Sequence, residues 1–188
     1  TEPKIVKYLD IPIQHCNSKI LKLMNRRGDG EFLRGLFAKL RQPAGMRGRR
    51  VPATVKATLR PYQKTGFHWL SYMQEMGFGA CLADDMGLGK TLQVLAFIAS
   101  KAQEGPALVV APKSVLPNWV AETNRFVPSI DVLVINDMEN RSQGILNAGA
   151  NTLLLCTYGV LSTIQNILIK KQWNVVCLDE AHCIKNHR

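Results

Sequence analysis

The stretch ADDMGLGKT, residues 83–91, carries the local pattern from which the fold of this chain can be worked out. An apolar run, ACLA (80–83), leads into it, and an amphipathic pattern, TLQVLAFIASKAQ (91–103), follows it. A glycine-rich turn between a strand and a helix aims backbone amides at one anion, and the helix start adds partial positive charge. Lys90 supplies a full positive charge at the same point. The pattern therefore predicts a binding site for a polyphosphate.

The turn departs in one position from the strict phosphate-loop pattern GxxxxGK[ST], because Asp84 stands where that pattern has glycine. The hydroxyl of Thr91 would lie beside the phosphates, where it can ligate magnesium. We expect seven consecutive residues of the turn and helix start to contact the bound polyphosphate: Met86, Gly87, Leu88, Gly89, Lys90, Thr91 and Leu92.

Beyond this turn, short apolar runs alternate with helical patterns. Such alternation predicts an α/β fold with right-handed crossovers and a mostly parallel sheet that has helices on both faces. The expected strands are 80–83, 107–112, 131–136, 152–157 and 174–179, and the expected helices are 91–103, 115–126 and 160–172.

The last expected strand ends in a pair of acids, within VVCLDEAH (175–182). In a parallel sheet its carboxyl end would lie beside the phosphate loop. There Asp179 could hold magnesium through water, and Glu180 could orient and deprotonate an attacking water. The alternative is an ordinary turn at the end of a strand.

Composition bounds the class of protein. The chain has 188 residues, of which 46% are hydrophobic, as in a globular domain with a packed core. Its longest apolar runs are shorter than the roughly 20 residues that cross a bilayer, and TEPKIVKY (1–8) lacks the apolar segment of a signal peptide. We expect an intracellular protein with no membrane partner. Its five cysteines show no zinc-site spacing and are expected to be buried thiols in a reducing compartment.

Positive charge is concentrated at the N-terminus. Residues 1–60 hold 14 Lys and Arg against 4 Asp and Glu, a balance of +10, whereas the remainder is balanced. This segment is either a nucleic-acid contact or a solvated helical face. The aperiodic QPAGMRGRRVPA (42–53) is expected to be a linker between an N-terminal segment (1–41) and the α/β domain (54–188).

Five motifs along the chain resemble, in order and spacing, those of the Swi/Snf-type ATPases, the DNA-translocating branch of helicase superfamily two. They are LRPYQKTGFHWL (59–70), LADDMGLGKT (82–91), LVVAPKSVLPNW (108–119), CTYG (156–159) and LDEAHCIKN (178–186). The resemblance covers about residues 51–188. It implies the first RecA-like lobe of a DNA-dependent ATPase, with ATP and Mg²⁺ as ligands and double-stranded DNA as partner.

The resemblance also implies roles for single residues. Gln63 corresponds to the adenine-reading glutamine, whose amide can both donate to and accept from adenine. Arg60 and Tyr62 would pack around the base, although Tyr62 could equally be a core residue. Phe67 and Trp69 are expected to be packing residues. His182 would couple the nucleotide site to a second lobe rather than bind metal.

DNA contact in this family falls on loops that follow strands. Lys113 and Ser114, after Pro112, match the motif that contacts phosphates of one strand, and Thr157 and Tyr158 match the next such position. Contacts of this kind would be independent of base sequence and sensitive to salt. For Lys113 the alternative is a solvated lysine at a helix start.

Residues 7–28, KYLDIPIQHCNSKILKLMNRRG, resemble a different family, the radical S-adenosylmethionine methylthiotransferases. The cysteine triplet that would bind an iron–sulfur cluster is absent from the sequence, so none of that chemistry is expected. We interpret the chain as a chimera or spliced fragment. Residues 29–41 could belong to either piece.

The sequence stops soon after the acid pair, so we expect the second RecA-like lobe and its arginines to lie outside it. The isolated chain should then bind ATP–Mg²⁺ weakly and hydrolyse it poorly, since arginine fingers contribute about 10³–10⁵ in rate. An exposed sheet edge would favour self-association. An RNA helicase lobe and a non-enzymatic binding module are the alternatives. The expected location is the cytoplasm of a bacterium, or the nucleus if the parent is eukaryotic.

Overall fold

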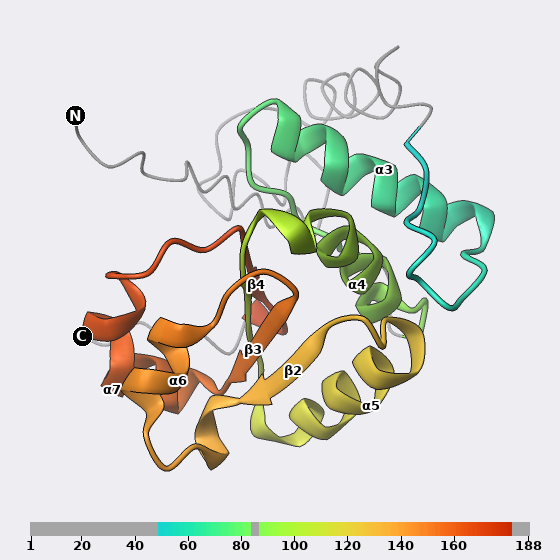
Figure 1. The fold of residues 1–188 in the computed structure, drawn as a ribbon. Coiled ribbons are helices and arrows are strands. Elements are labelled where there is room, and N and C mark those ends of the chain that lie inside the picture. The colour runs from blue at the N-terminus through green and yellow to red at the C-terminus, as the bar shows by residue number, and fades with distance from the viewer. Residues whose placement is uncertain (1–48, 84–86, 182–188) are drawn as a thin grey trace, which may run out of the picture. The chain divides into compact units, whose positions relative to one another are not determined.

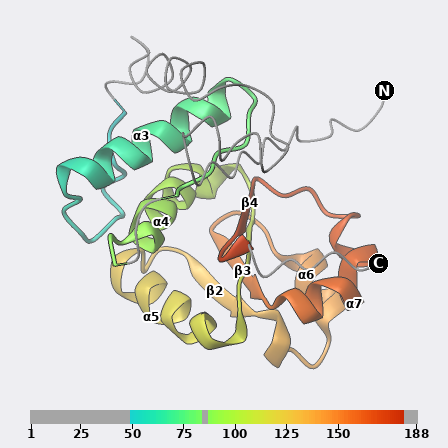
Figure 2. The same cartoon turned by 180° about the vertical axis from the view of Figure 1, so that it is seen from behind.

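The structure is a computed structural model that describes residues 49–83 and 87–181 of the chain. These residues form two compact units (Figures 1 and 2). The first contains the described residues 49–50, 61–83 and 87–90, and the second contains 51–60 and 91–181. The expected segment 1–41, with its methylthiotransferase-like stretch, lies outside the described residues.

The second unit is built on a parallel sheet of four strands (Figure 1). The strands lie in the order β2-β3-β1-β4, and every neighbouring pair is parallel. After β1 the chain forms β2 and β3 on one side of β1, and it then crosses to form β4 on the other side. The direction of the connections therefore changes at β1, and α/β folds of this type bind ligands at the carboxyl ends of the strands beside such a point. The strands are β1 (Ala107–Val110), β2 (Asp131–Val134), β3 (Thr152–Cys156) and β4 (Val175–Leu178).

Helices cover both faces of this sheet. Neighbouring side chains of a strand point to opposite faces, so Val109 of β1 packs in one core cluster with α4 and α5, while Val110 packs in the other with α6 and α7. The two central strands are buried along almost their whole length, which explains their continuous apolar sequences. The helices are α4 (Lys90–Lys101), α5 (Leu116–Phe126), α6 (Arg141–Asn147) and α7 (Tyr158–Leu168), with short 3₁₀ turns η1 (Ala102–Glu104), η2 (Lys113–Val115) and η3 (Ile135–Asp137).

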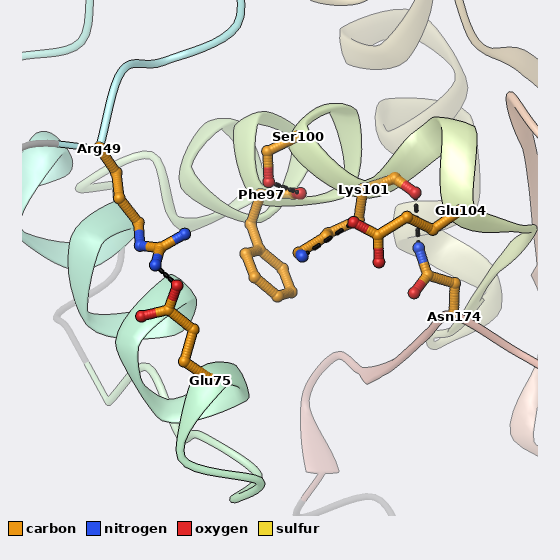
Figure 3. Close-up of polar contacts among 7 residues, drawn as sticks. All are labelled: Arg49, Glu75, Phe97, Ser100, Lys101, Glu104 and Asn174. Carbon is orange, nitrogen blue, oxygen red and sulfur yellow. Dashed lines mark hydrogen bonds and ion pairs between the residues drawn. The ribbon is translucent and has the colours of Figure 1, made fainter.

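Helix α4 has its C-terminal end at the amino edge of the sheet. The side-chain amide of Asn174, just before β4, donates to the carbonyl of Lys101 at 2.5 Å (Figure 3). The backbone amide of Asn151, just before β3, donates to the carbonyl of Ala102 at 2.7 Å. Leu95 and Ile98 of the helix pack against the sheet. A helix of this length spans about 18 Å, enough to run the length of these strands. Its N-terminal end therefore lies at the carboxyl edge.

The first unit is centred on α3 (Pro61–Glu75). Its last residue, Glu75, forms an ion pair with Arg49 (Figure 3). Gly77, with φ of 73°, ends the helix in the left-handed conformation that glycine adopts without steric cost, and the amide of Phe78 bonds to the carbonyl of Met73 at 2.9 Å. This turn starts the segment that leads toward the phosphate loop.

The predicted α/β fold with a parallel sheet and flanking helices is confirmed, and four of the five expected strands are present. The expectation of a strand at 80–83 is wrong: these residues carry no strand pairing. Four small or apolar residues are too short a run to decide between a strand and other extended chain. Helix α6 was not predicted. In the described part of the chain, no helix is long and apolar enough to cross a membrane.

The described cysteines differ in their exposure to solvent. Cys156 is buried in β3 and Cys177 is half-buried in β4, but Cys81 is exposed, so the expectation of uniformly buried thiols is wrong for that residue. Burial raises the pKa of Cys156 to about 12; burial, and secondarily the nearby Asp179 carboxylate, raise the pKa of Cys177 to about 12. Cys16 and Cys183 lie outside the described residues.

Alkylation should follow this difference. The thiolate is the reacting form, and a raised pKa keeps Cys156 and Cys177 protonated from pH 7 to pH 9. We expect iodoacetamide to modify Cys81 quickly in the native chain and to leave those two cysteines unmodified until the chain is unfolded, as measured by peptide mass mapping. Rapid native labelling of Cys156 would contradict the packing of β3.

Candidate functional site

The phosphate-loop residues that the structure describes have the backbone of an anion-binding turn. Gly87 has φ of 82° and Gly89 has φ of 71°, both in the left-handed region that favours glycine. Helix α4 begins immediately afterwards, at Lys90, so the positive end of the helix dipole follows the turn directly. Leu88 between the glycines is exposed. This arrangement fits a bound phosphate group. Met86 lies outside the described residues.

Gln63 contacts the phosphate loop. Its side chain is buried in α3, with 7% of its surface exposed, and Nε2 donates to the carbonyl of Leu88 at 3.2 Å. The residue expected to read adenine is thus joined to the backbone of the phosphate loop. Sequence reasoning did not foresee this contact, because residues 63 and 88 are far apart along the chain.

Two features favour glycine at position 89: its positive φ and the close approach of the Gln63 side chain. A Cβ at Gly89 would lie 2.6 Å from Nε2 of Gln63, whereas a Cβ at Gly87 would have no neighbour within 4 Å. We expect Gly89→Ala to displace the Gln63 amide and to cost more stability than Gly87→Ala, whose cost is the left-handed backbone term of about 1–2 kcal/mol. Urea denaturation of both variants measures the difference. Equal free energies of unfolding would contradict the Gln63 contact.

Asp179 follows β4 directly and is held by three hydrogen bonds. Its backbone amide donates to the carbonyl of Val110 at 2.8 Å, which continues the β1–β4 ladder. Its own backbone carbonyl accepts from the hydroxyl of Tyr158 at 2.7 Å. Its carboxylate Oδ2 accepts from Nε1 of Trp119 at 2.8 Å. The acid is therefore fixed in both backbone and side chain at the carboxyl edge of the sheet.

Glu180 has an unusual backbone conformation, with φ of 51°. A residue with a side chain rarely takes the left-handed conformation, and such residues concentrate at functional sites. The strand ends at Leu178, so this conformation turns the chain sharply after Asp179. The two neighbouring carboxylates consequently do not continue the alternation of the strand.

The expected DNA-contacting residues begin two helices of the same unit. Lys113 and Ser114 are exposed in η2, directly before α5. Thr157 caps α7, since its hydroxyl accepts from the amide of Val160 at 3.3 Å. Asn136 holds Thr157 from the end of the neighbouring strand: its Nδ2 donates to the Thr157 hydroxyl at 3.2 Å, and its Oδ1 accepts from the Thr157 amide at 3.3 Å.

Within the second unit the structure brings several predicted residues to one edge of the sheet. Residues that follow parallel strands lie at their carboxyl ends, and the start of α4 lies at this edge as well. The set consists of Thr91, Lys113, Ser114, Thr157, Tyr158, Asp179 and Glu180. In the described residues no group of His, Cys, Asp or Glu forms a metal cluster by itself. His182 lies outside the described residues.

The exposure of the side chains on α3 tests two of the expectations about aromatic residues. Tyr62 is 39% exposed, so the alternative that it is a core residue is wrong. Phe67 is 1% exposed, which confirms it as a packing residue, and Trp69 is half-buried. Arg60, also expected near the base, is exposed.

Sequence reasoning missed Trp119 and Asn136 as residues of this edge. Trp119 is the last residue of the motif LVVAPKSVLPNW, but nothing in that motif shows that its indole contacts an acid 60 residues away. Asn136 lies in a short 3₁₀ turn and has no sequence signal of its own.

A glycine-rich phosphate loop before a helix, and an acid pair at the end of a parallel strand, define the P-loop class of α/β nucleotide-binding domains. The profile of the SNF2-related domain matches residues 62–188. The chain therefore belongs to the SNF2-related family.

Known relatives extend this result. YwqA of Bacillus subtilis, which is named as an ATP-dependent helicase/translocase, is 41% identical over 161 residues, covering 82% of this chain and 17% of that protein. The ISWI chromatin-remodeling complex ATPase ISW1 of Saccharomyces cerevisiae is 38% identical over 150 residues, covering 73% of this chain and 13% of that protein. The chain thus spans a small part of the length of these relatives.

A solved structure confirms the fold. The SWI2/SNF2 ATPase core of Sulfolobus solfataricus, solved in complex with double-stranded DNA, superposes with a TM-score of 0.64 at 41% sequence identity. The match covers 73% of this chain and 30% of the other. The four-stranded parallel sheet with its flanking helices therefore matches the fold of a lobe of that ATPase core.

Proposed function

We propose that this chain is the ATP-binding lobe of an ATP-dependent translocase that moves along double-stranded DNA. The observation that carries the proposal is the start of α4 at Lys90, directly after two glycines with positive φ. Residues 86–92 would hold the phosphates, Gln63 and Arg60 would contact the base, and Thr91 and Asp179 would hold magnesium. Relatives named as ATP-dependent helicases, and a neighbour solved with DNA, support both ligands.

The residues of each unit fit one part of a magnesium–nucleotide complex. The turn offers backbone amides, Lys90 offers a positive charge, and Asp179 offers a carboxylate whose orientation is fixed by Trp119. Magnesium, when bound, would neutralise charge on the phosphates. Glu180 would orient a water molecule and accept its proton, and His182 would couple the site to a second RecA-like lobe. That lobe would supply the arginines for hydrolysis.

The DNA contact would consist of phosphate contacts at the carboxyl edge of the sheet. Lys113 and Ser114 are exposed and precede a helix, and Thr157 begins another. Residues of this kind contact phosphates without reading bases. Self-association through an exposed sheet edge, and a bacterial cytoplasmic or eukaryotic nuclear location, are further parts of this proposal.

Salt dependence tests the DNA contact. Replacing Lys113 by alanine should weaken duplex DNA binding and lower the slope of log affinity against log salt by about 0.9, the value for one phosphate contact. Lys170→Ala, an exposed lysine after α7, is the matched control and should leave the slope unchanged. The measurement is fluorescence anisotropy with a labelled duplex over a salt series. A Lys113→Ala slope equal to that of the control would overturn this contact, and tighter binding to duplex RNA would favour the RNA helicase alternative.

A further inference from the structure

We propose that Trp119 and Tyr158 are positioning residues for Asp179, and through it for Glu180 and magnesium. The inference rests on the proposed function, in which Asp179 holds the metal. Both residues and the acid lie in the second unit. Their contacts to Asp179 differ in kind: one holds the carboxylate and the other holds the main chain.

The contact of Trp119 fixes the carboxylate. An indole has a single N–H donor and no acceptor. Trp119 is only 2% exposed, so its N–H depends on Asp179 Oδ2, at 2.8 Å, for a partner. A buried donor left without an acceptor is costly, and this cost holds the carboxylate in one orientation. Oδ1 would then be the carboxylate oxygen left to contact magnesium, directly or through water.

The contact of Tyr158 fixes the peptide group after Asp179. The hydroxyl donates to the Asp179 carbonyl at 2.7 Å, while the Asp179 amide is held by Val110. The carbonyl oxygen of Asp179 and the nitrogen of Glu180 belong to one planar group. Holding that oxygen therefore orients the backbone of Glu180, which has the left-handed φ of 51°.

Both donors belong to helices that begin at the proposed DNA contacts. Trp119 lies in the first turns of α5, which follows Lys113 and Ser114, and Tyr158 is the first residue of α7, next to Thr157. If DNA binding moved the start of either helix, the hydrogen bond from that helix to Asp179 would change in length or direction. The two hydrogen bonds thus connect the proposed DNA contacts to the proposed metal ligand.

A second tryptophan of the same unit provides an internal comparison. Nε1 of Trp173 donates to the backbone carbonyl of Leu168 at 2.9 Å, an interaction that serves packing. Trp119 is also a core residue, but its N–H is directed at a carboxylate at the end of a strand. Removing the indole N–H from Trp119 and from Trp173 therefore distinguishes a role in positioning Asp179 from a role in packing.

The test keeps the ring and removes the donor. Trp119 is replaced by β-(3-benzothienyl)alanine, in which sulfur takes the place of the indole N–H, and Tyr158 is replaced by phenylalanine. The controls are the same analogue at Trp173, and Tyr72→Phe on α3. Calorimetry of the full chain measures ADP affinity over a series of Mg²⁺ concentrations and in EDTA, and thermal unfolding checks the fold.

We expect the two test variants to require about tenfold more Mg²⁺ for half-maximal tightening of ADP binding, as is typical when a residue behind a metal ligand is removed. Affinity in EDTA should not change, and the controls should match the unmodified chain. The inference is overturned if the test variants match their controls, or if their affinity falls equally with and without magnesium. If the unmodified chain binds no nucleotide, the proposed function fails and the inference falls with it.

The Trp119 hydrogen bond can be tested without nucleotide. In ¹⁵N–¹H spectra, Asp179→Ala should shift the indole signal of Trp119 and leave that of Trp173 in place. An unmoved Trp119 signal would overturn the inference even if nucleotide binding follows the proposed function.

Discussion

Lys90→Ala should weaken ATP binding by roughly 10- to 100-fold, the loss expected when a charge-assisted contact worth about 1.5–3 kcal/mol is removed. Lys90 is the first residue of α4 and directly follows Gly89, so its ammonium group is the cation nearest in sequence to the proposed phosphate site. Anisotropy of a fluorescent ATP analogue measures the change.

The matched control for this result is Lys101→Ala, at the other end of the same helix. Lys101 bonds Glu104 on the surface (Figure 3), so its loss should leave ATP affinity unchanged. Equal affinities for the two variants would contradict the role of the loop, because any general effect of positive charge on ATP would be shared by both.

Glu180→Gln should leave ATP binding intact and lower hydrolysis by about 10²–10⁴-fold, the range for a lost general base. The experiment needs a longer protein in which this lobe is joined to a second RecA-like lobe, since the proposed arginines lie there. Glutamine keeps the size of the side chain and its capacity to hydrogen-bond, but it cannot accept the proton of water at neutral pH.

Phosphate release in single-turnover conditions is the measurement for this variant. Glu122→Gln, at a half-buried position of α5 where the carboxylate accepts from Asn118, is a control of the same chemistry away from the strand ends. An unchanged rate in Glu180→Gln would exclude this residue as the base. Lost binding would show instead that the carboxylate serves the fold of the turn after β4.

The fold was predictable because its signals are local. Runs such as LLLC (153–156) are apolar throughout because β3 is buried on both faces there, and the Gly-Lys-Thr sequence marks the point where α4 begins. Helix α6 was missed because its seven residues contain a glycine and give little periodicity; only the cap at Asn140 marks it.

The contacts within the site were not predictable in the same way. Trp119 meets Asp179 across 60 positions of sequence, and Gln63 meets Leu88 across 25. Each contact depends on the tertiary arrangement of helices around the strand ends or the loop. The motifs predicted which residues would carry the chemistry, whereas the structure showed which neighbouring side chains form hydrogen bonds to them.

The most direct test of the central claim is a calorimetric titration of the unmodified chain with ATP, with and without Mg²⁺. The account predicts saturable binding of one nucleotide, tighter with magnesium than in EDTA, because the loop would hold the phosphates and Asp179 the metal. A chain that is folded, as judged by circular dichroism, and that gives no binding heat for ATP in either condition would contradict it.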